Sequence, residues 1–239
     1  MLLAVLQPKS HFDSFSTFAE TIESAVCREE FDVLVLPELS WPCKDEAITE
    51  LAASASIDRI KSYVKDLSRR KHAVIGFTIN TSIADRFCSA PFAVFDGKLC
   101  SRPTPPPPPT IDDTFTKACF LATEFVNVAV FSDTPSEHLL PDPVLEFADI
   151  LMVSDTTRVG CDSVSRACLT SQSRRHKVYT MMARFAPNLG SEREGSSIVS
   201  PNGHVLIDAG AEPGLHMTEI PDFMPLRRRG RWLPWPIRA

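Results

Sequence analysis

Residues 31 to 41 read Phe31-Asp-Val-Leu-Val-Leu-Pro-Glu-Leu-Ser-Trp41, an apolar run that ends in one carboxylate, that of Glu38. A continuous apolar run is typical of a strand buried in a parallel sheet, and α/β sheets place their chemistry at the carboxyl ends of such strands. Glu38 is therefore a candidate general base. The alternative for a lone glutamate at a strand end is structural: it caps the next turn or pairs with a lysine or arginine.

Strand and helix patterns alternate around this stretch. Apolar residues recur at helical spacing in Ser14–Arg28 and Ser56–Lys71, and Ser165–Met182 is expected to begin as a helix and end as a strand. Two sequences, Asp96-Gly97 and Pro201-Asn202-Gly203, indicate hairpin turns. The other segments expected to be strands are 2–7, 33–36, 73–79, 92–95, 98–101, 117–122, 125–131, 150–153, 197–199 and 204–207. This mixture predicts one α/β domain, a sandwich with parallel and antiparallel strand pairs.

Composition narrows the class of protein. A chain of 239 residues that is 44% hydrophobic and 23% charged is typical of a soluble globular domain. The net charge of −5 argues against nucleic acid or an anionic membrane as the main partner. No apolar run reaches the roughly 18 residues that span a bilayer, and the first residues lack the basic region of a signal peptide.

The cysteines indicate a reducing compartment. Their number is odd, no two form a Cys-x-x-Cys pair, and no spacing among them suggests a zinc site. They are Cys27, Cys43, Cys88, Cys100, Cys119, Cys161 and Cys168. We therefore expect free thiols, a cytoplasmic protein, and neither a metal nor a cofactor.

Two segments depart from the globular pattern. Pro105–Pro109 must be extended, which predicts a stiff exposed loop or, alternatively, a motif for a proline-binding partner. Residues 226–239 interleave arginines with tryptophans and are expected to pack on the domain or on a second subunit rather than on nucleic acid. The predicted organisation is a domain over 1–225 followed by a basic tail over 226–239.

Short motifs along the chain resemble, in the same order, those of the nitrilase or carbon–nitrogen hydrolase superfamily. The matching pieces are Ala4–Gln7, Leu34–Glu38, Val74–Phe77, Phe95–Gly97, Ala148–Val153, Asn188 and Gly195–Leu206. Together they cover nearly the whole chain. The resemblance implies an αββα sandwich that often pairs into a four-layer homodimer.

The chemistry of that family uses a Glu base, a Lys that stabilises the oxyanion, and a Cys nucleophile. A thiol attacks only as the thiolate, so it needs a base in contact, and the oxyanion needs a fixed positive donor. Glu38 matches the base position. Phe131 stands where the resemblance places the cysteine, with Asp133 in its usual place after it. The lysine position falls near Thr104, where Arg102 is the nearest cation and Lys98 the next.

Four other residues are possible nucleophiles. Ser132 should point away from the face that residue 131 uses, because strand residues alternate. Cys119 lies inside a predicted strand rather than at an elbow, and Cys43 follows Glu38 by only a few residues. Cys161 lies in a loop where the family places substrate contacts, which makes it the first alternative to test.

Two functions of different classes follow. The first is a catalytically degenerate nitrilase-fold protein that binds a small amide-like or nitrile-like ligand or a partner subunit, with Phe131 filling the floor of the pocket. The second is an active amide or nitrile hydrolase whose nucleophile has moved to another cysteine such as Cys161, with Arg102 as its cation. A third and weaker reading is an interaction protein that works through the proline run and the basic tail.

Overall fold

A computed structural model describes residues 1–9, 12, 14–39, 50–83, 86–100, 118–131, 147–154, 166–187 and 194–224. The described strands are β1 Leu2–Gln7, β2 Val33–Val35, β3 Val74–Ile83, β4 Arg86–Phe95, β5 Lys98–Cys100, β6 Ala118–Ala122, β7 Asn127–Phe131, β8 Ile150–Ser154, β9 Tyr179–Ala183, β10 Ser197–Val199, β11 Val205–Asp208 and β12 Gly214–Glu219. The described helices are α1 Phe15–Val26, α2 Glu50–Lys71 and α4 Arg166–His176.

The strands form two sheets. The first sheet has the order β12-β1-β2-β3-β4-β5, and the second has the order β11-β10-β9-β8-β7-β6. In each sheet three central strands are parallel: β1, β2 and β3 in the first, and β7, β8 and β9 in the second. The flanking strands pair antiparallel. The predicted mixture of parallel and antiparallel pairs in one domain is confirmed.

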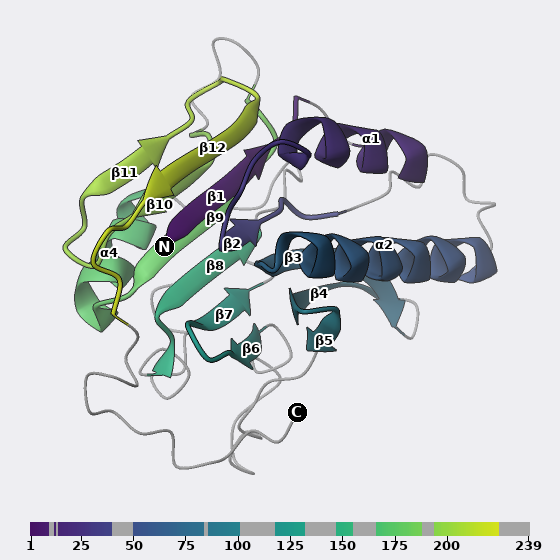
Figure 1. Ribbon diagram of the computed structural model, residues 1–239. Helices are drawn as coiled ribbons and strands as arrows, with labels where there is room; N and C mark the ends of the chain where they lie inside the picture. Colours follow the sequence, from purple (N-terminus) through teal and green to yellow (C-terminus); the bar gives the residue numbers. More distant parts are fainter. Residues whose placement is uncertain are drawn as a thin grey trace.

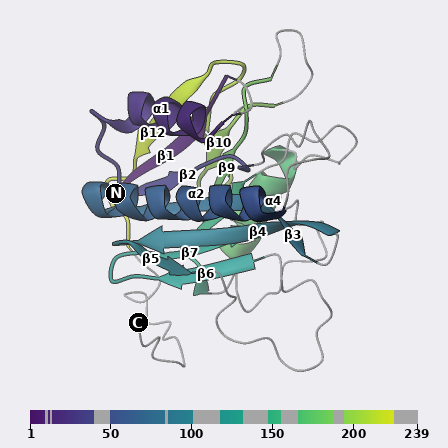
Figure 2. The same ribbon diagram turned by 90° about the vertical axis from the view of Figure 1, so that its right-hand side faces the viewer.

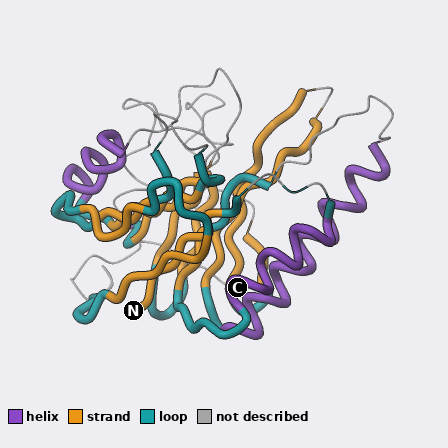
Figure 3. The backbone as a smooth tube through the Cα atoms, turned by 90° about the horizontal axis from the view of Figure 1, so that it is seen from above, coloured by secondary structure: helices purple, strands orange, loops and turns teal. Residues whose placement is uncertain are grey.

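The two sheets pack face to face, with helices outside them. Alternate residues of the central strands, such as Val5, Val35 and Val130, belong to a core between the sheets. The opposite face of the first sheet packs against α1 and α2, and the opposite face of the second packs against α4. Figure 1 and Figure 3 show the strands in the middle, with α4 on one side and the other two helices on the other. We call these three clusters the inter-sheet core, the first outer core and the second outer core.

Gly76 lets the sheets approach closely in the middle of β3. A methyl group built on Gly76 would lie 2.3 Å from Sδ of Met152 and 3.1 Å from Cγ2 of Val130, both on the second sheet. Interiors are packed nearly as tightly as organic crystals, so this space is available only because the residue has no side chain.

The first predicted hairpin is confirmed. Asp96 and Gly97 both have positive φ angles, 49° and 71°, as a two-residue type I′ turn requires, and they join β4 to β5. The second hairpin joins β10 to β11 with Gly203 at φ 80°. In both places the local sequence encodes the turn directly.

Two parts of the first sheet differ from the sequence-based expectation. β3 and β4 pair as far as Ile83 and Arg86, well beyond the predicted ends, because the added residues lack the regular apolar alternation of a half-buried strand. β12 was not predicted. It pairs antiparallel with β1, and its Leu215 and Met217 pack against the first outer core. The strand therefore depends on tertiary contacts, which the sequence of this short segment does not predict.

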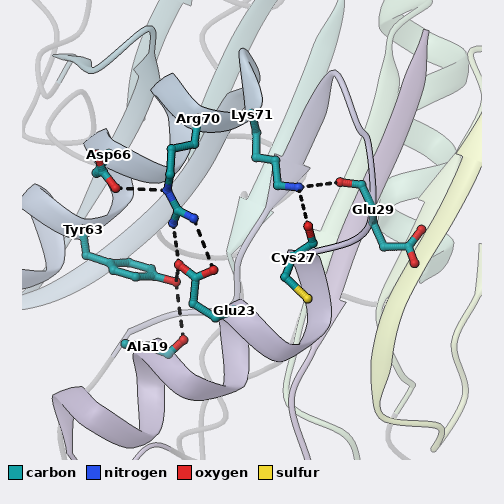
Figure 4. A network of polar contacts seen from close by, with 8 residues as sticks. All are labelled: Ala19, Glu23, Cys27, Glu29, Tyr63, Asp66, Arg70 and Lys71. Atoms are coloured by element: carbon teal, nitrogen blue, oxygen red, sulfur yellow. Dashed lines mark hydrogen bonds and ion pairs between the residues drawn. The ribbon is translucent and has the colours of Figure 1, made fainter.

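A polar network fastens α1 to α2 on the outside of the first sheet (Figure 4). The Arg70 guanidinium on α2 forms an ion pair with the Glu23 carboxylate on α1 and a second with Asp66, the latter at 3.0 Å. The Tyr63 hydroxyl donates to Oε1 of Glu23 at 3.0 Å. Nζ of Lys71 donates to the backbone carbonyl of Cys27, 3.2 Å away, just after α1. The two helices are thus held together by side chains as well as by their apolar faces.

This network gives a small pH dependence of stability. The hydrogen bond from Arg70 holds the pKa of Glu23 below its ordinary value of 4.5. A carboxyl with a lowered pKa in the folded state stabilises the fold above its unfolded pKa, and this contribution is lost as the pH falls through the folded value. Because the pair is well exposed, we expect Glu23→Gln to cost at most about 1 kcal/mol at pH 7. Urea unfolding of both proteins at pH 7 and pH 3 should show this difference shrinking at the lower pH.

The described helices contain no segment that is long and apolar enough to cross a membrane. Among the described residues, no group of three or more histidine, cysteine, aspartate or glutamate side chains is placed to hold a metal ion. Pro105–Pro109 and the tail 226–239 both lie outside the described residues.

Candidate functional site

The carboxyl ends of the central strands of both sheets lie at one end of the sandwich. The hydroxyl of Thr78 on β3 donates to that of Ser154 at the end of β8, with the two oxygens 3.0 Å apart and fully buried. This bond crosses from one sheet to the other, so the end of β8 faces the middle of β3 at Thr78. The residues that directly follow β2 and the last residue of β7 are brought to the same region by the strand pairing.

Glu38 is placed there by an irregularity in the pairing of β2 with β3. Val35 pairs with Gly76 and Leu39 with Ile79, so three residues, 36–38, stand opposite two, 77 and 78. The extra residue has the effect of a β-bulge, which bends a strand and re-aims a side chain. Pro37 suits this position because it has no backbone N–H to pair.

The Glu38 side chain is buried. Leu36 and Leu39, on either side of Pro37 and Glu38, both belong to the first outer core. Only 2% of Glu38 is exposed. Placing a carboxylate in such a position is costly unless it is paired or hydrogen-bonded. A buried carboxylate at the end of a central strand fits the general-base position that the sequence predicts.

We expect the Thr78–Ser154 bond to stabilise this end of the sandwich. Thr78→Val keeps the shape and leaves the buried Ser154 hydroxyl without its donor, which should lower the free energy of unfolding by about 1–3 kcal/mol. Adding Ser154→Ala removes both partners, so the double variant should lose less than the sum of the two single losses. Urea unfolding of the four proteins measures this coupling. Losses that add to within about 0.5 kcal/mol would contradict it.

A second polar group at the same end joins β1 to the segment before β10. The side chain of Gln7, fully buried at the end of β1, accepts a hydrogen bond from the Ser196 backbone N–H at 2.5 Å. Its Nε2 donates to the carbonyls of Gly210, at 3.2 Å, and Glu212, at 2.8 Å. Both the oxygen and the nitrogen of the Gln7 amide therefore form hydrogen bonds with the backbone of other segments, which is a structural role.

Arg184, directly after β9, extends this group. Its backbone N–H donates to the Ser196 hydroxyl at 2.9 Å, and its Nη1 donates to the Glu194 carbonyl at 3.2 Å. The residue is 5% exposed. A carboxylate oxygen of Glu194 in turn accepts from the Arg166 backbone N–H at 2.5 Å, at the start of α4. A guanidinium is thus buried at the same end of the sandwich as Glu38.

Phe131, at the expected nucleophile position, is the last residue of β7. It is 4% exposed and packs in the second outer core with residues such as Phe120 and Leu169. Its neighbour Val130 belongs to the inter-sheet core, so the two side chains lie on opposite faces of the sheet. The Phe131 ring packs on the helix side of the second sheet. The expectation that it fills the floor of a pocket stays a prediction.

The other sequence candidates are only partly described. Cys119 is on β6, as predicted, and is fully buried. A hydrogen bond with the Cys100 thiol and then burial raise the pKa of Cys119, which is opposite to the lowered pKa of an activated nucleophile. Lys98 is exposed on β5. Four other candidates lie outside the described residues: Cys43, Arg102, Ser132 and Cys161.

Sequence reasoning missed Gln7, Thr78, Ser154 and Arg184 as members of this end. Each is the polar residue at the point where an apolar strand run stops: Leu2–Leu6, Val74–Phe77, Ile150–Val153 and Met181–Ala183 precede them. A polar residue of any charge at the carboxyl end of an apolar strand is the signal that could have identified them, as it identified Glu38.

Comparison with known proteins supports the fold. No protein-family model and no curated protein sequence matches the chain. Among solved structures, the amidase NitN from Nesterenkonia sp. AN1 superposes with a TM-score of 0.64 at 15% identity, over 93% of each chain. A cysteine-to-alanine variant of the amidase from that organism, in complex with butyramide, gives 0.66 at 14% identity, over 92% of this chain and 91% of that one.

A glutamate-to-glutamine variant of the same amidase shows the Michael addition of acrylamide at its active-site cysteine; its TM-score is 0.65 at 13% identity, over 92% of this chain and 93% of that one. These amidases are of the nitrilase superfamily. At such low identity the likeness establishes the fold, and the chain therefore has the nitrilase fold. The αββα sandwich implied by the sequence motifs is confirmed.

Proposed function

We propose that this protein is a catalytically degenerate nitrilase-fold protein that binds a small amide-like or nitrile-like ligand near Glu38 without hydrolysing it. The observation that carries the proposal is the identity and packing of Phe131. A phenylalanine stands where the family resemblance places the nucleophile, and its ring is part of an apolar cluster on the outer face of the second sheet. A hydrocarbon ring cannot attack a carbonyl or nitrile carbon.

The burial and titration of one described thiol also support the proposal. Cys119 is buried with a raised pKa, Cys27 is exposed after α1, and Cys168 is on α4 outside the second sheet. The raised pKa of Cys119 is the opposite of the lowered pKa that an acyl-forming thiol needs. Glu38 would then serve as a hydrogen-bonding group for a ligand amide.

Binding gives the first test. Butyramide and acrylamide, which are seen with the Nesterenkonia amidases, are suitable probes together with small nitriles. Isothermal titration calorimetry should detect binding that weakens about 10- to 100-fold in Glu38→Gln, because a hydrogen bond to a charged group contributes about 1.5–3 kcal/mol. Glu219→Gln is the matched control. Glu219 is exposed opposite Leu2, at the far end of β1 from Gln7, and its replacement should leave binding unchanged.

Activity gives the second test. Ammonia release is measured with purified protein on amides, nitriles and N-carbamoyl amino acids, with Glu38→Gln alongside. Under this proposal the wild-type rate equals the rate of the variant. Turnover that Glu38→Gln abolishes would overturn the proposal.

The second candidate function is an active carbon–nitrogen hydrolase with a relocated cysteine, such as Cys161, and Arg102 as the cation. The observation that favours it is the burial of Glu38, since a carboxylate at 2% exposure is costly to keep without a role. This function requires one hyper-reactive thiol. Timed alkylation with iodoacetamide, followed by peptide mapping, should find one cysteine that is protected in Glu38→Gln. Slow alkylation of every cysteine would count against it.

The resemblance also supports a homodimer, and the odd number of cysteines, with no Cys-x-x-Cys pair, supports a cytoplasmic location; both are part of this proposal. Light scattering on the purified full chain measures the first. Fractionation of cells that express the protein measures the second.

A further inference from the structure

Two cysteines lie on the edge strands that face each other at one side of the sandwich. Cys100 is the last residue of β5, the edge of the first sheet, and Cys119 is the second residue of β6, the edge of the second sheet. Figure 2 shows β5 and β6 one above the other at this side. The two strands are also in direct contact.

The thiols of this pair reach across from one sheet to the other. Sγ of Cys119 donates to the backbone carbonyl of Cys100 at 3.1 Å. Sγ of Cys100 donates to the backbone carbonyl of Phe120, the residue after Cys119, at 3.2 Å. Each sulfur therefore lies against the backbone of the other cysteine or of its neighbour, and the side chains converge from opposite strands.

The two thiols differ in access. Cys119 is fully buried in the inter-sheet core, whereas Cys100 is partly exposed at its margin. The contact with the Cys100 thiol and burial raise the pKa of Cys119, so Cys119 by itself is a poor thiolate. A reagent from solution meets Cys100 first.

We propose that Cys100 and Cys119 form a redox-sensitive dithiol that closes to an intramolecular disulfide when it meets a small-molecule disulfide such as oxidised glutathione. The Cys100 thiolate attacks one glutathione sulfur, forming a mixed disulfide and releasing one glutathione thiolate. Sγ of Cys119 then attacks Sγ of Cys100, which breaks the mixed disulfide and releases the second glutathione. The two protein thiols lose two electrons and two protons, and oxidised glutathione gains both to become two thiols.

The bond would join the edges of the two sheets and close the chain over residues 101–118. A crosslink of this kind stabilises mainly by restricting the unfolded chain. We therefore expect the oxidised protein to unfold at a higher urea concentration than the reduced protein. The shift should reverse with a reducing agent.

The test uses the full chain, incubated with oxidised glutathione, quenched by alkylation and mapped by mass spectrometry. The expected result is a peptide pair linked through Cys100 and Cys119. Exposed Cys27 is the internal control, because its mixed disulfide with glutathione shows that the reagent reacted. In Cys119→Ser, the reaction should stop with glutathione on Cys100, and the urea shift should disappear.

Two results would overturn the proposal. One is glutathione on Cys27 of the wild-type protein while Cys100 and Cys119 are recovered without a bond between them. The other is failure of dibromobimane, which becomes fluorescent when it bridges two neighbouring thiols, to link this pair in the reduced native protein. Both measurements use wild-type protein, so they decide the matter even if Cys119→Ser does not fold.

Discussion

Phe131→Ala is expected to lower the free energy of unfolding by about 3–5 kcal/mol, the range for removing a buried aromatic ring from a packed core. Phe131 is 4% exposed and packs in the second outer core, between the second sheet and α4. Urea unfolding followed by circular dichroism measures the change. Phe131→Leu is the matched control, because it keeps apolar volume and should cost under about 1.5 kcal/mol. A loss below 1 kcal/mol for alanine would contradict the packing of the ring.

A cysteine at position 131 tests whether this position can support catalysis. Phe131→Cys restores the residue type that the family resemblance places there, but the new thiol would enter an apolar cluster, where burial raises a thiol pKa. We therefore expect no ammonia release from this variant. Release that depended on Glu38 would show that residue 131 can reach the base, and would contradict the outward packing of Phe131.

Gly195→Ala is the second change with a large expected effect. A methyl group on Gly195 would lie 2.0 Å from the carbonyl oxygen of Gly210 and 2.9 Å from Oε1 of Gln7. The first contact is with backbone, which cannot rotate away. The second disturbs the bond between Gln7 and the Ser196 backbone N–H. Overpacking and a lost buried hydrogen bond each cost about 1–3 kcal/mol, so we expect a loss of about 3 kcal/mol or more.

Gly210→Ala is the control for this prediction. Gly210 has a φ of 54°, so alanine there suffers the left-handed backbone penalty of about 1–2 kcal/mol. Yet no atom lies within 4 Å of its methyl position. Thermal and urea unfolding should therefore show the larger loss of unfolding free energy for Gly195→Ala. At Gly195 the backbone angle suits alanine, but there is no room for the methyl group. The reverse order would mean that the segment around Gly210 moves aside.

The sequence predicted the parts of the fold that are encoded locally. The Asp96-Gly97 turn needs two residues with positive φ, and the helical spacing in 14–28 and 56–71 marks buried faces of α1 and α2. The longer pairing of β3 with β4, and β12 altogether, depended on partners distant in the chain. A strand stabilised by its neighbour rather than by its own alternation leaves little trace in the sequence.

For the candidate site, the sequence by itself determined that an apolar strand ends in Glu38 and that Phe131 occupies the expected nucleophile position. It could not determine which way either side chain points. The extra residue between β2 and Leu39 interrupts the regular alternation at Glu38, and the alternation of β7 turns Phe131 to the helix side of its sheet. Only the tertiary structure brought Thr78 to Ser154 and Cys100 to Cys119, because each pair joins two sheets whose contact depends on the packing of the whole sandwich.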